Sequence, residues 1–279
     1  MTKTTGLIGY PVSHSLSPHI HSYWLKEHGL DADYKLFTTA PARLRQTILH
    51  MRKKNAIGLN VTVPHKQAVM EYLDSHDEAA TRIGAVNTIL NRDGKFIGSN
   101  TDAYGFITNL KNGLGELKPY LENVVLLGAG GATRAAIVAL IDEGAARITL
   151  TNRTQEKAET LAQYFSIATA TPITVAPWDD REKILREATL LVNTTSLGMI
   201  SHHLLHLDVK QLPRDAAVHD IVYAPLETEL LKNAKKRGLK TVDGLGMLLY
   251  QAQAAFAQWH GVTPEVTQKL RAHIMEQLA

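Results

Sequence analysis

Lys66 is a residue whose type and position could serve proton transfer. The apolar, strand-like run "GLNVTV" leads into Pro64 and then to this single lysine, at the start of an amphipathic stretch. A lysine ammonium can give a proton to a developing alkoxide, and the neutral amine can take it back. Most lysines at such a place are solvated surface charges. The segment alone therefore leaves both interpretations open.

Polar side chains gather after several predicted strands of the first half. In open parallel sheets, ligands bind beyond the carboxyl ends of the strands. Hydroxyl and amide groups there suit a small polyhydroxylated molecule, with one lysine and one carboxylate for proton transfer. A helix-capping role is the alternative for Ser15, Ser17 or Asp102 taken singly, and it is their grouping that favours a site. The gathered residues are Ser15, Ser17, Asn60, Thr62, Lys66, Asn87, Asn100, Thr101 and Asp102.

A glycine-rich turn in the second half predicts a dinucleotide site. The segment "NVVLLGAGGATRAAIVALIDEG" passes from a strand through Gly128, Gly130 and Gly131 into an alanine-rich helix. Glycines let the backbone approach a pyrophosphate, and the free N–H groups of the helix start bind its charge. Thr133 stands where the usual G-x-G-x-x-G pattern has its last glycine. The context between strand and helix strengthens a motif that is weak alone.

The following strand, "ARITLTNRT", indicates which nucleotide binds. NAD-binding proteins place an acidic residue at its end for the ribose 2′-hydroxyl. Here Asn152 and Arg153 stand there, with Lys157 one turn into the helix. A guanidinium offers a 2′-phosphate charge-assisted donors, so the sequence predicts NADP. Arg153 as a plain surface cation is less favoured, because a cation at the positive end of a helix dipole is unfavourable without an anion.

Apolar runs and helical patterns alternate along the chain, which is typical of an α/β protein with largely parallel sheets. Around "NRDG" two strand-like runs predict a hairpin, giving a mixed sheet with an antiparallel edge. We expect two domains, with a boundary near residues 103–120. The final stretch "MLLYQAQAAFAQWHG" has apolar residues at helical spacing and no strand after it, so it must pack onto an earlier part of the chain; if it returns to the first domain, that domain is discontinuous.

Composition excludes several other classes of protein. The 279 residues include no cysteine, so disulfides, thiolate metal sites and a cysteine nucleophile are excluded. Lys and Arg exceed Asp and Glu by only 30 to 27, with no basic footprint for nucleic acid. No apolar run is long enough to cross a membrane, and we expect a cytoplasmic protein. The histidines show no metal-ligand spacing, so no metal is implied, and no G-x-S-x-G elbow is present.

Nine segments in order carry a family resemblance: "GYPVSHSLSP", "GLNVTVPHK", "GAVNT", "NTD", "GAGGATRAA", "NRT" with Lys157, "NTTSLGM", "DIVYAPLET" and "DGLGMLLYQ". Together they resemble shikimate dehydrogenase over nearly the whole chain. The resemblance implies a substrate domain of residues 1–102, completed by C-terminal helices 246–279, and a Rossmann-like NADP domain of residues 103–245. It implies reduction of 3-dehydroshikimate to shikimate, on the route to chorismate and the aromatic amino acids.

The resemblance also implies roles for individual residues. Lys66 would be the acid and base, with Asp102 as its catalytic partner. The implied substrate-binding residues are Ser15, Ser17, Thr62, Lys66, Asn87, Asp102, Tyr223 and Gln251. The implied cofactor-binding residues are Gly128, Ala129, Gly130, Gly131, Ala132, Asn152, Arg153, Thr154, Lys157, Ile221 and Gly244. One departure is Ala103, where the family often has glycine, and it concerns local backbone geometry only.

The expected reaction is hydride transfer from NADPH to the ketone carbon while Lys66 protonates the developing alkoxide. One alternative is a quinate/shikimate dehydrogenase, which commonly prefers NAD; Arg153 and the pair Ser15 and Ser17 argue against it. Another is a catalytically silent NADP-binding sensor, which the presence of Lys66 with Asp102 disfavours. The expected partners are shikimate or 3-dehydroshikimate, with no nucleic acid and no membrane, and a homodimer is left open.

Overall fold

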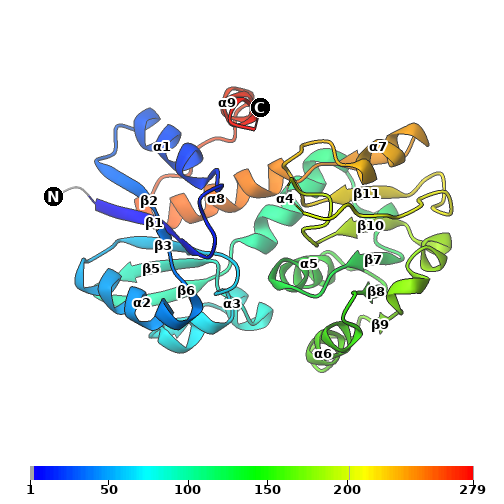
Figure 1. The fold of residues 1–279 in the computed structure, drawn as a ribbon, viewed down its shortest axis with the longest axis horizontal. Helices are drawn as coiled ribbons and strands as arrows, with labels where there is room; N and C mark the ends of the chain where they lie inside the picture. The colour runs from blue at the N-terminus through cyan, green and yellow to red at the C-terminus, as the bar shows by residue number, and fades with distance from the viewer. Residues whose placement is uncertain (1–2, 201, 279) are drawn as a thin grey trace. The chain divides into compact units, whose positions relative to one another are not determined.

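The computed structural model describes residues 3–200 and 202–278, which form two compact units (Figure 1). One unit runs to Asp102 and resumes at Leu249, and the other spans Ala103–Leu248. Each unit has its own six-stranded sheet. The predicted fold class, α/β with two domains and mostly parallel sheets, is confirmed. None of the described helices is long and apolar enough to span a membrane.

The sheet of the first unit is mixed, in the order β2-β1-β3-β5-β6-β4. Strands β1, β2 and β3 are parallel, whereas β5 runs antiparallel to both β3 and β6. The predicted hairpin is confirmed, since Asp93 and Gly94 take positive φ angles of 54° and 82° in its turn. The hairpin does not form the edge, however, because β4 pairs beyond β6. The strands are β1 (Lys3–Gly9), β2 (Ala32–Thr38), β3 (Gly58–Val61), β4 (Ser75–His76), β5 (Thr88–Arg92) and β6 (Lys95–Ser99).

Helices cover this sheet and bring the end of the chain back to it. Trp259 of α8 donates from its indole nitrogen to the carbonyl of Ile89 in β5 at 3.0 Å. A Cβ on Gly58 would lie 2.0 Å from the same nitrogen, so β3 needs glycine there for the helix to approach. The helices of the unit are α1 (Ser17–Glu27), α2 (Leu44–Lys53), α3 (Glu78–Ile83), most of α8 (Leu245–His260) and α9 (Gln268–Glu276), with 3-10 turns at Pro41–Arg43 and Ala68–Tyr72.

The sheet of the second unit is wholly parallel, in the order β12-β11-β10-β7-β8-β9. The order reverses beside β7, so the loops after β7 and β10 diverge at the point where doubly wound sheets bind nucleotides. All four residues of β7 are buried, as its apolar run predicts. The strands are β7 (Val124–Leu127), β8 (Ile148–Thr151), β9 (Ile173–Val175), β10 (Leu190–Asn193), β11 (Ala217–Asp220) and β12 (Lys240–Val242).

The helices of the second unit connect these strands as the alternating pattern predicts. Helix α5 joins β7 to β8, and α6 joins β8 to β9, which makes two successive β-α-β crossover units between parallel strands. The helices are α4 (Asp102–Leu114), α5 (Gly131–Asp142), α6 (Gln155–Ser166) and α7 (Glu229–Lys236), with 3-10 turns at Lys118–Tyr120, Trp178–Asp180 and Lys183–Glu187.

Candidate active site

Lys66 and Asp102 form an ion pair in the first unit. The ammonium of Lys66, in the turn after β3, contacts Oδ2 of Asp102, the first residue of α4. The Lys66 side chain is 18% exposed and that of Asp102 only 6%, so the pair is largely withdrawn from water. The Asp102 amide donates to Asn100 Oδ1 at 2.9 Å, so Asn100 supports the start of the helix. The Asp102 carboxylate is thereby left to face side chains.

Asn87 holds the second oxygen of this carboxylate. Its amide nitrogen donates to Asp102 Oδ1 at 2.8 Å and to Thr101 Oγ1 at 2.9 Å, while its Oδ1 accepts from the Thr101 amide at 2.8 Å. The same nitrogen lies 3.4 Å from Gln251 Oε1 on α8. The structure therefore brings Lys66, Asn87, Asp102 and Gln251 together, although they come from four separate segments.

Ser15 and Ser17 lie together at the start of α1. Ser15 Oγ donates to Ser17 Oγ at 3.2 Å and accepts from the Ser17 amide at 3.3 Å. The N-cap of α1 is Leu16, which makes no side-chain cap, but Ser15 Oγ accepts from the first amide of the helix, so a capping role accounts in part for Ser15 and not for Ser17. Thr62 is half-buried in the turn that carries Lys66. A Cβ added to Gly9 would lie 2.4 Å from the methyl carbon of Thr62, so the end of β1 approaches this turn closely.

The glycine-rich turn of the second unit fits a pyrophosphate. Gly128 takes a φ of 120°, which favours glycine, and its amide donates to Thr151 O at 2.8 Å. A Cβ on Gly130 would meet no atom within 4 Å, so open space adjoins the turn. Thr133 Oγ1 accepts from the Gly130 amide at 3.0 Å, which explains a threonine in place of the last glycine. The first N–H groups of α5, at Gly131 and the predicted site residue Ala132, have no acceptor within the helix.

The end of β8 fits a 2′-phosphate. Asn152 donates to the Thr154 carbonyl at 2.8 Å and shapes the turn into α6. Arg153 and Lys157 are exposed, and neither pairs with a carboxylate within the described part of the chain. Two free cations beside a helix start favour an anion there. The residues present therefore fit NADP, with Ala129 in the turn between Gly128 and Gly130.

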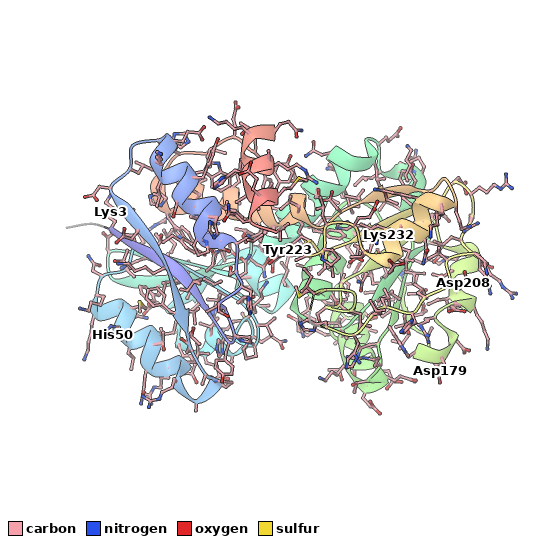
Figure 2. All side chains as sticks on the ribbon, turned by 45° about the horizontal axis from the view of Figure 1, so that its top comes forward. Lys3, His50, Asp179, Asp208, Tyr223 and Lys232 are labelled. Atoms are coloured by element: carbon pink, nitrogen blue, oxygen red, sulfur yellow. The ribbon has the colours of Figure 1, made fainter. Side chains whose placement is uncertain are left out.

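A third group of predicted residues follows β11 and β12. A Cβ on Gly244 would lie 2.1 Å from the Ile221 carbonyl oxygen, so only glycine allows these two loops to approach this closely. Tyr223 is partly buried in the segment after Ile221 (Figure 2), and burial raises the pKa of its phenol. Nothing in the contacts of Tyr223 identifies what it binds, and its substrate role stays a prediction.

Asp220 is a supporting residue that the sequence reasoning missed. Its carboxylate is fully buried and accepts from Asn193 Nδ2 at 2.9 Å, the Val222 amide at 3.0 Å and Thr228 Oγ1 at 2.7 Å. Burial raises the pKa of Asp220 to about 6, although these hydrogen bonds oppose the rise. Asp220 thereby holds the loop that begins at Ile221. The signal that could have found it is a charged residue inside the strand-like run "VHDIV".

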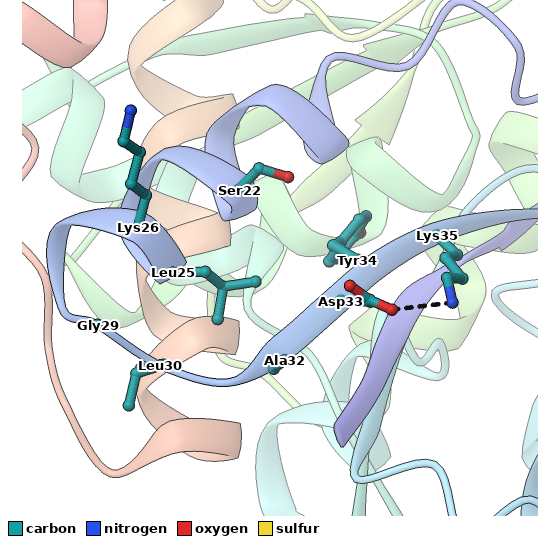
Figure 3. A pocket seen from close by; sticks show the side chains of 9 residues that line it. All are labelled: Ser22, Leu25, Lys26, Gly29, Leu30, Ala32, Asp33, Tyr34 and Lys35. Carbon is teal, nitrogen blue, oxygen red and sulfur yellow. Dashed lines mark ion pairs between the residues drawn. The ribbon is translucent and has the colours of Figure 1, made fainter. Parts of the chain in front are cut away.

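A surface pocket on the first unit is separate from the predicted site residues. It has a volume of about 420 Å³ between α1 and β2, and its lining includes Ser22, Leu25 and Tyr34 (Figure 3). The ion pair of Asp33 with Lys35 lies at its rim. None of the predicted site residues is among the described residues that line it. The candidate site is therefore defined by side-chain chemistry and not by this hollow.

Three family models match the chain. They are described as shikimate dehydrogenase substrate binding domain over residues 7–89, shikimate/quinate 5-dehydrogenase over residues 113–222, and shikimate 5′-dehydrogenase C-terminal domain over residues 244–272. A relative from Rhodospirillum rubrum, named shikimate dehydrogenase (NADP(+)), is 46% identical over 274 residues. The match covers 98% of this chain and 97% of that relative.

Two solved structures extend the comparison to the fold. A shikimate dehydrogenase in complex with NADP+ superposes with a TM-score of 0.92 at 38% identity, covering 100% of this chain and 96% of that one. A quinate dehydrogenase from Corynebacterium glutamicum in complex with NAD gives a TM-score of 0.91 at 32% identity, covering 99% of each chain. The similarity therefore includes both compact units.

Proposed function

Because the chain belongs to the shikimate dehydrogenase family, we propose that it reduces 3-dehydroshikimate reversibly to shikimate with NADPH. It is an NADP-dependent oxidoreductase acting on a CH–OH group, in the pathway to chorismate and the aromatic amino acids. The ion pair between Lys66 and Asp102, whose carboxylate Asn87 holds, is the observation that best supports this chemistry. A lysine held in this way is suited to proton transfer.

Lys66 is the residue that would move the proton. In the reducing direction its ammonium would donate to the oxygen of the substrate ketone as negative charge develops there. In the oxidising direction the neutral amine would accept the proton of the same hydroxyl, by microscopic reversibility. Asp102 would hold the Lys66 nitrogen in place, and its largely buried carboxylate would also accept from a substrate hydroxyl. Catalysis thus depends on the placement of the lysine nitrogen.

The remaining predicted residues would bind substrate and cofactor. The substrate-binding side chains, besides the catalytic pair, are Ser15, Ser17, Thr62, Asn87, Tyr223 and Gln251. The turn from Gly128 to Ala132 would receive the pyrophosphate, and Arg153 with Lys157 the 2′-phosphate, while Ile221 and Gly244 would lie near the nicotinamide. Bound NADPH would supply the hydride. Arg153 in place of an acidic residue supports NADP over NAD.

The assay that tests this function follows NADPH absorbance during oxidation of shikimate and of quinate, each with NADP and with NAD. We expect NADP reduction with shikimate and little with quinate or NAD. Comparable turnover of quinate with NAD would place the protein with quinate dehydrogenases. Binding of NADPH with no turnover of either substrate would support a silent sensor instead.

Two further features belong to the same proposal. The enzyme would act in the cytoplasm, where its cofactor is kept reduced. It would also assemble as a homodimer, and size-exclusion chromatography with light scattering tests this, since a single species at the mass of one chain would refute it.

A further inference from the structure

Tyr34 is a buried tyrosine of β2 that the sequence reasoning did not select. Tyr34 is 7% exposed. Its ring stacks on that of His21 in α1, with the ring centroids 4.2 Å apart and an angle of 5° between the ring planes. Figure 3 shows Tyr34 on β2 beside α1. The stacking fixes where the phenol oxygen lies. This matters because that oxygen sits among the polar groups of the candidate site.

The Tyr34 hydroxyl is held by Asn60 of β3. It donates to Asn60 Oδ1 at 2.8 Å, and Asn60 is itself only 4% exposed. Burial raises the pKa of the Tyr34 phenol, and a hydrogen bond with the Ser17 side chain opposes that rise. The phenol therefore keeps its proton at all ordinary pH values and stays a donor. The donated hydrogen bond thus orients the side chain of Asn60.

Asn60 carries the connection onward to Asn87. Its amide nitrogen donates to the Asn87 carbonyl at 3.2 Å and to Thr88 Oγ1 at 3.2 Å. Thr88 Oγ1 in turn donates to Asn87 Oδ1 at 3.0 Å. Since a carbonyl only accepts, the amide of Asn60 has one orientation, and its Oδ1 must face Tyr34. Asn87 then donates to Asp102, as described above.

We propose that Tyr34 is a positioning residue for substrate binding, which acts through Asn60 on the group of Asn87 and Asp102. The proposal rests on the proposed function, in which Asn87 contacts the substrate. Without the Tyr34 hydroxyl, Asn60 Oδ1 becomes a buried acceptor without a donor, and the amide that donates to the Asn87 carbonyl and to Thr88 loses its fixed orientation. Lys66 and Asp102 keep their direct contact, so the effect falls on binding more than on chemistry.

The test is a double-mutant cycle with Tyr34→Phe and Asn60→Ala, measured as the KM for shikimate. Tyr34→Phe should raise the KM for shikimate roughly ten-fold, with kcat changed less and the KM for NADP unchanged, the effect of about one hydrogen bond. In the double variant the two effects should not multiply, because Tyr34 acts through Asn60. Multiplying effects would show independent roles and overturn the proposal, as would an unchanged KM in Tyr34→Phe.

Tyr23→Phe is the matched control. It removes the hydroxyl of a tyrosine on α1, and this hydroxyl makes no hydrogen bond within residues 3–200 and 202–278. It should leave the KM for shikimate unchanged. If Tyr34→Phe does not fold, Asn60→Ala alone removes the bond from its other end and should raise the KM for shikimate in the same way, whereas an unchanged KM in that variant would overturn the proposal. Failure of the parent protein to oxidise shikimate would refute the proposed function and this inference with it, whereas parent turnover with multiplying effects refutes the inference alone.

Discussion

One carboxylate, that of Asp102, joins Lys66 to Asn87: Oδ2 contacts the lysine ammonium, and Oδ1 accepts from the asparagine amide at 2.8 Å. A largely buried ion pair is costly unless its remaining hydrogen-bonding capacity is satisfied. Here the asparagine satisfies it, so the carboxylate has one orientation and the ammonium one position. This arrangement suits a group that must meet a substrate oxygen within hydrogen-bond distance.

Lys66→Ala should lower kcat for shikimate oxidation by roughly 10²- to 10⁴-fold, the usual contribution of one acid or base. The KM for shikimate should rise much less. Steady-state kinetics in both directions measure the two constants, and Lys54→Ala, at an exposed position after α2, is the control. A large rise in KM with kcat preserved would assign Lys66 to binding.

Most of the fold followed from local patterns in the sequence. The alternation of apolar runs with helical segments predicts both sheets, and Asp93 with Gly94 predicts the hairpin turn that the structure contains. The two-residue strand β4 was not predicted, because Ser75 and His76 carry no strand signal and pair only through β6. Such a strand is a product of tertiary pairing and not of propensity.

The residues that support the site were harder to predict than the site residues. Lys66 and Asp102 stand out as charged residues at strand ends. Tyr34 lies within a strand, where a tyrosine is ordinary, and its partner Asn60, although gathered with the polar residues above, is distant in sequence. Asp220 is similar, since one of its donors, Asn193, ends the neighbouring strand β10, while Val222 and Thr228 lie in the segment that follows Asp220. Contacts of this kind depend on the packing of the sheet, which a single sequence does not specify.

Arg153→Ala should lower kcat/KM for NADP roughly ten- to a hundred-fold and leave that for NAD nearly unchanged. The reason is the loss of charge-assisted donors to the 2′-phosphate, which NAD lacks. The measurement is kcat/KM for both cofactors at saturating shikimate. Arg147→Ala at the other end of β8, where the arginine pairs with Glu187, is the matched control. Equal losses with both cofactors would contradict a role in phosphate recognition.

Gly130→Ala separates cofactor binding from folding. At Gly130 the φ is −97° and the ψ is −168°, which alanine adopts freely, and a Cβ there meets no protein atom within 4 Å. The variant should therefore keep the melting temperature of the parent. Its KM for NADPH should rise, because the methyl group enters the space proposed for the pyrophosphate. Gly128→Ala, at a φ of 120°, should instead lower the melting temperature. An unchanged KM in Gly130→Ala would contradict this location for the pyrophosphate.

The burial of His21 predicts how the free energy of unfolding depends on pH. It is fully buried, and within the described part of the chain neither ring nitrogen has a hydrogen-bond partner. Burial, and then the neighbouring His260, lowers the pKa of His21 to about 3. The unfolded chain binds a proton here below its ordinary pKa, whereas the folded chain does not. The contribution of His21 to stability is thus full above about pH 6.5 and is lost as pH falls toward 3.

His21→Phe should flatten this dependence by about 1.4 kcal/mol per pH unit below about pH 6, whatever its effect near neutrality. Urea unfolding at several pH values measures the slope, and fluorescence of Trp24 and Trp259, whose rings lie 6.1 Å and 5.3 Å from that of His21, reports on this unit. Burial also lowers the pKa of His260 to about 4, so part of the acid sensitivity should remain. His50→Phe, at an exposed position on α2 (Figure 2), should keep the parent slope. Parallel slopes for parent and His21→Phe would mean that His21 takes up a proton in the folded state, contrary to its burial without a partner.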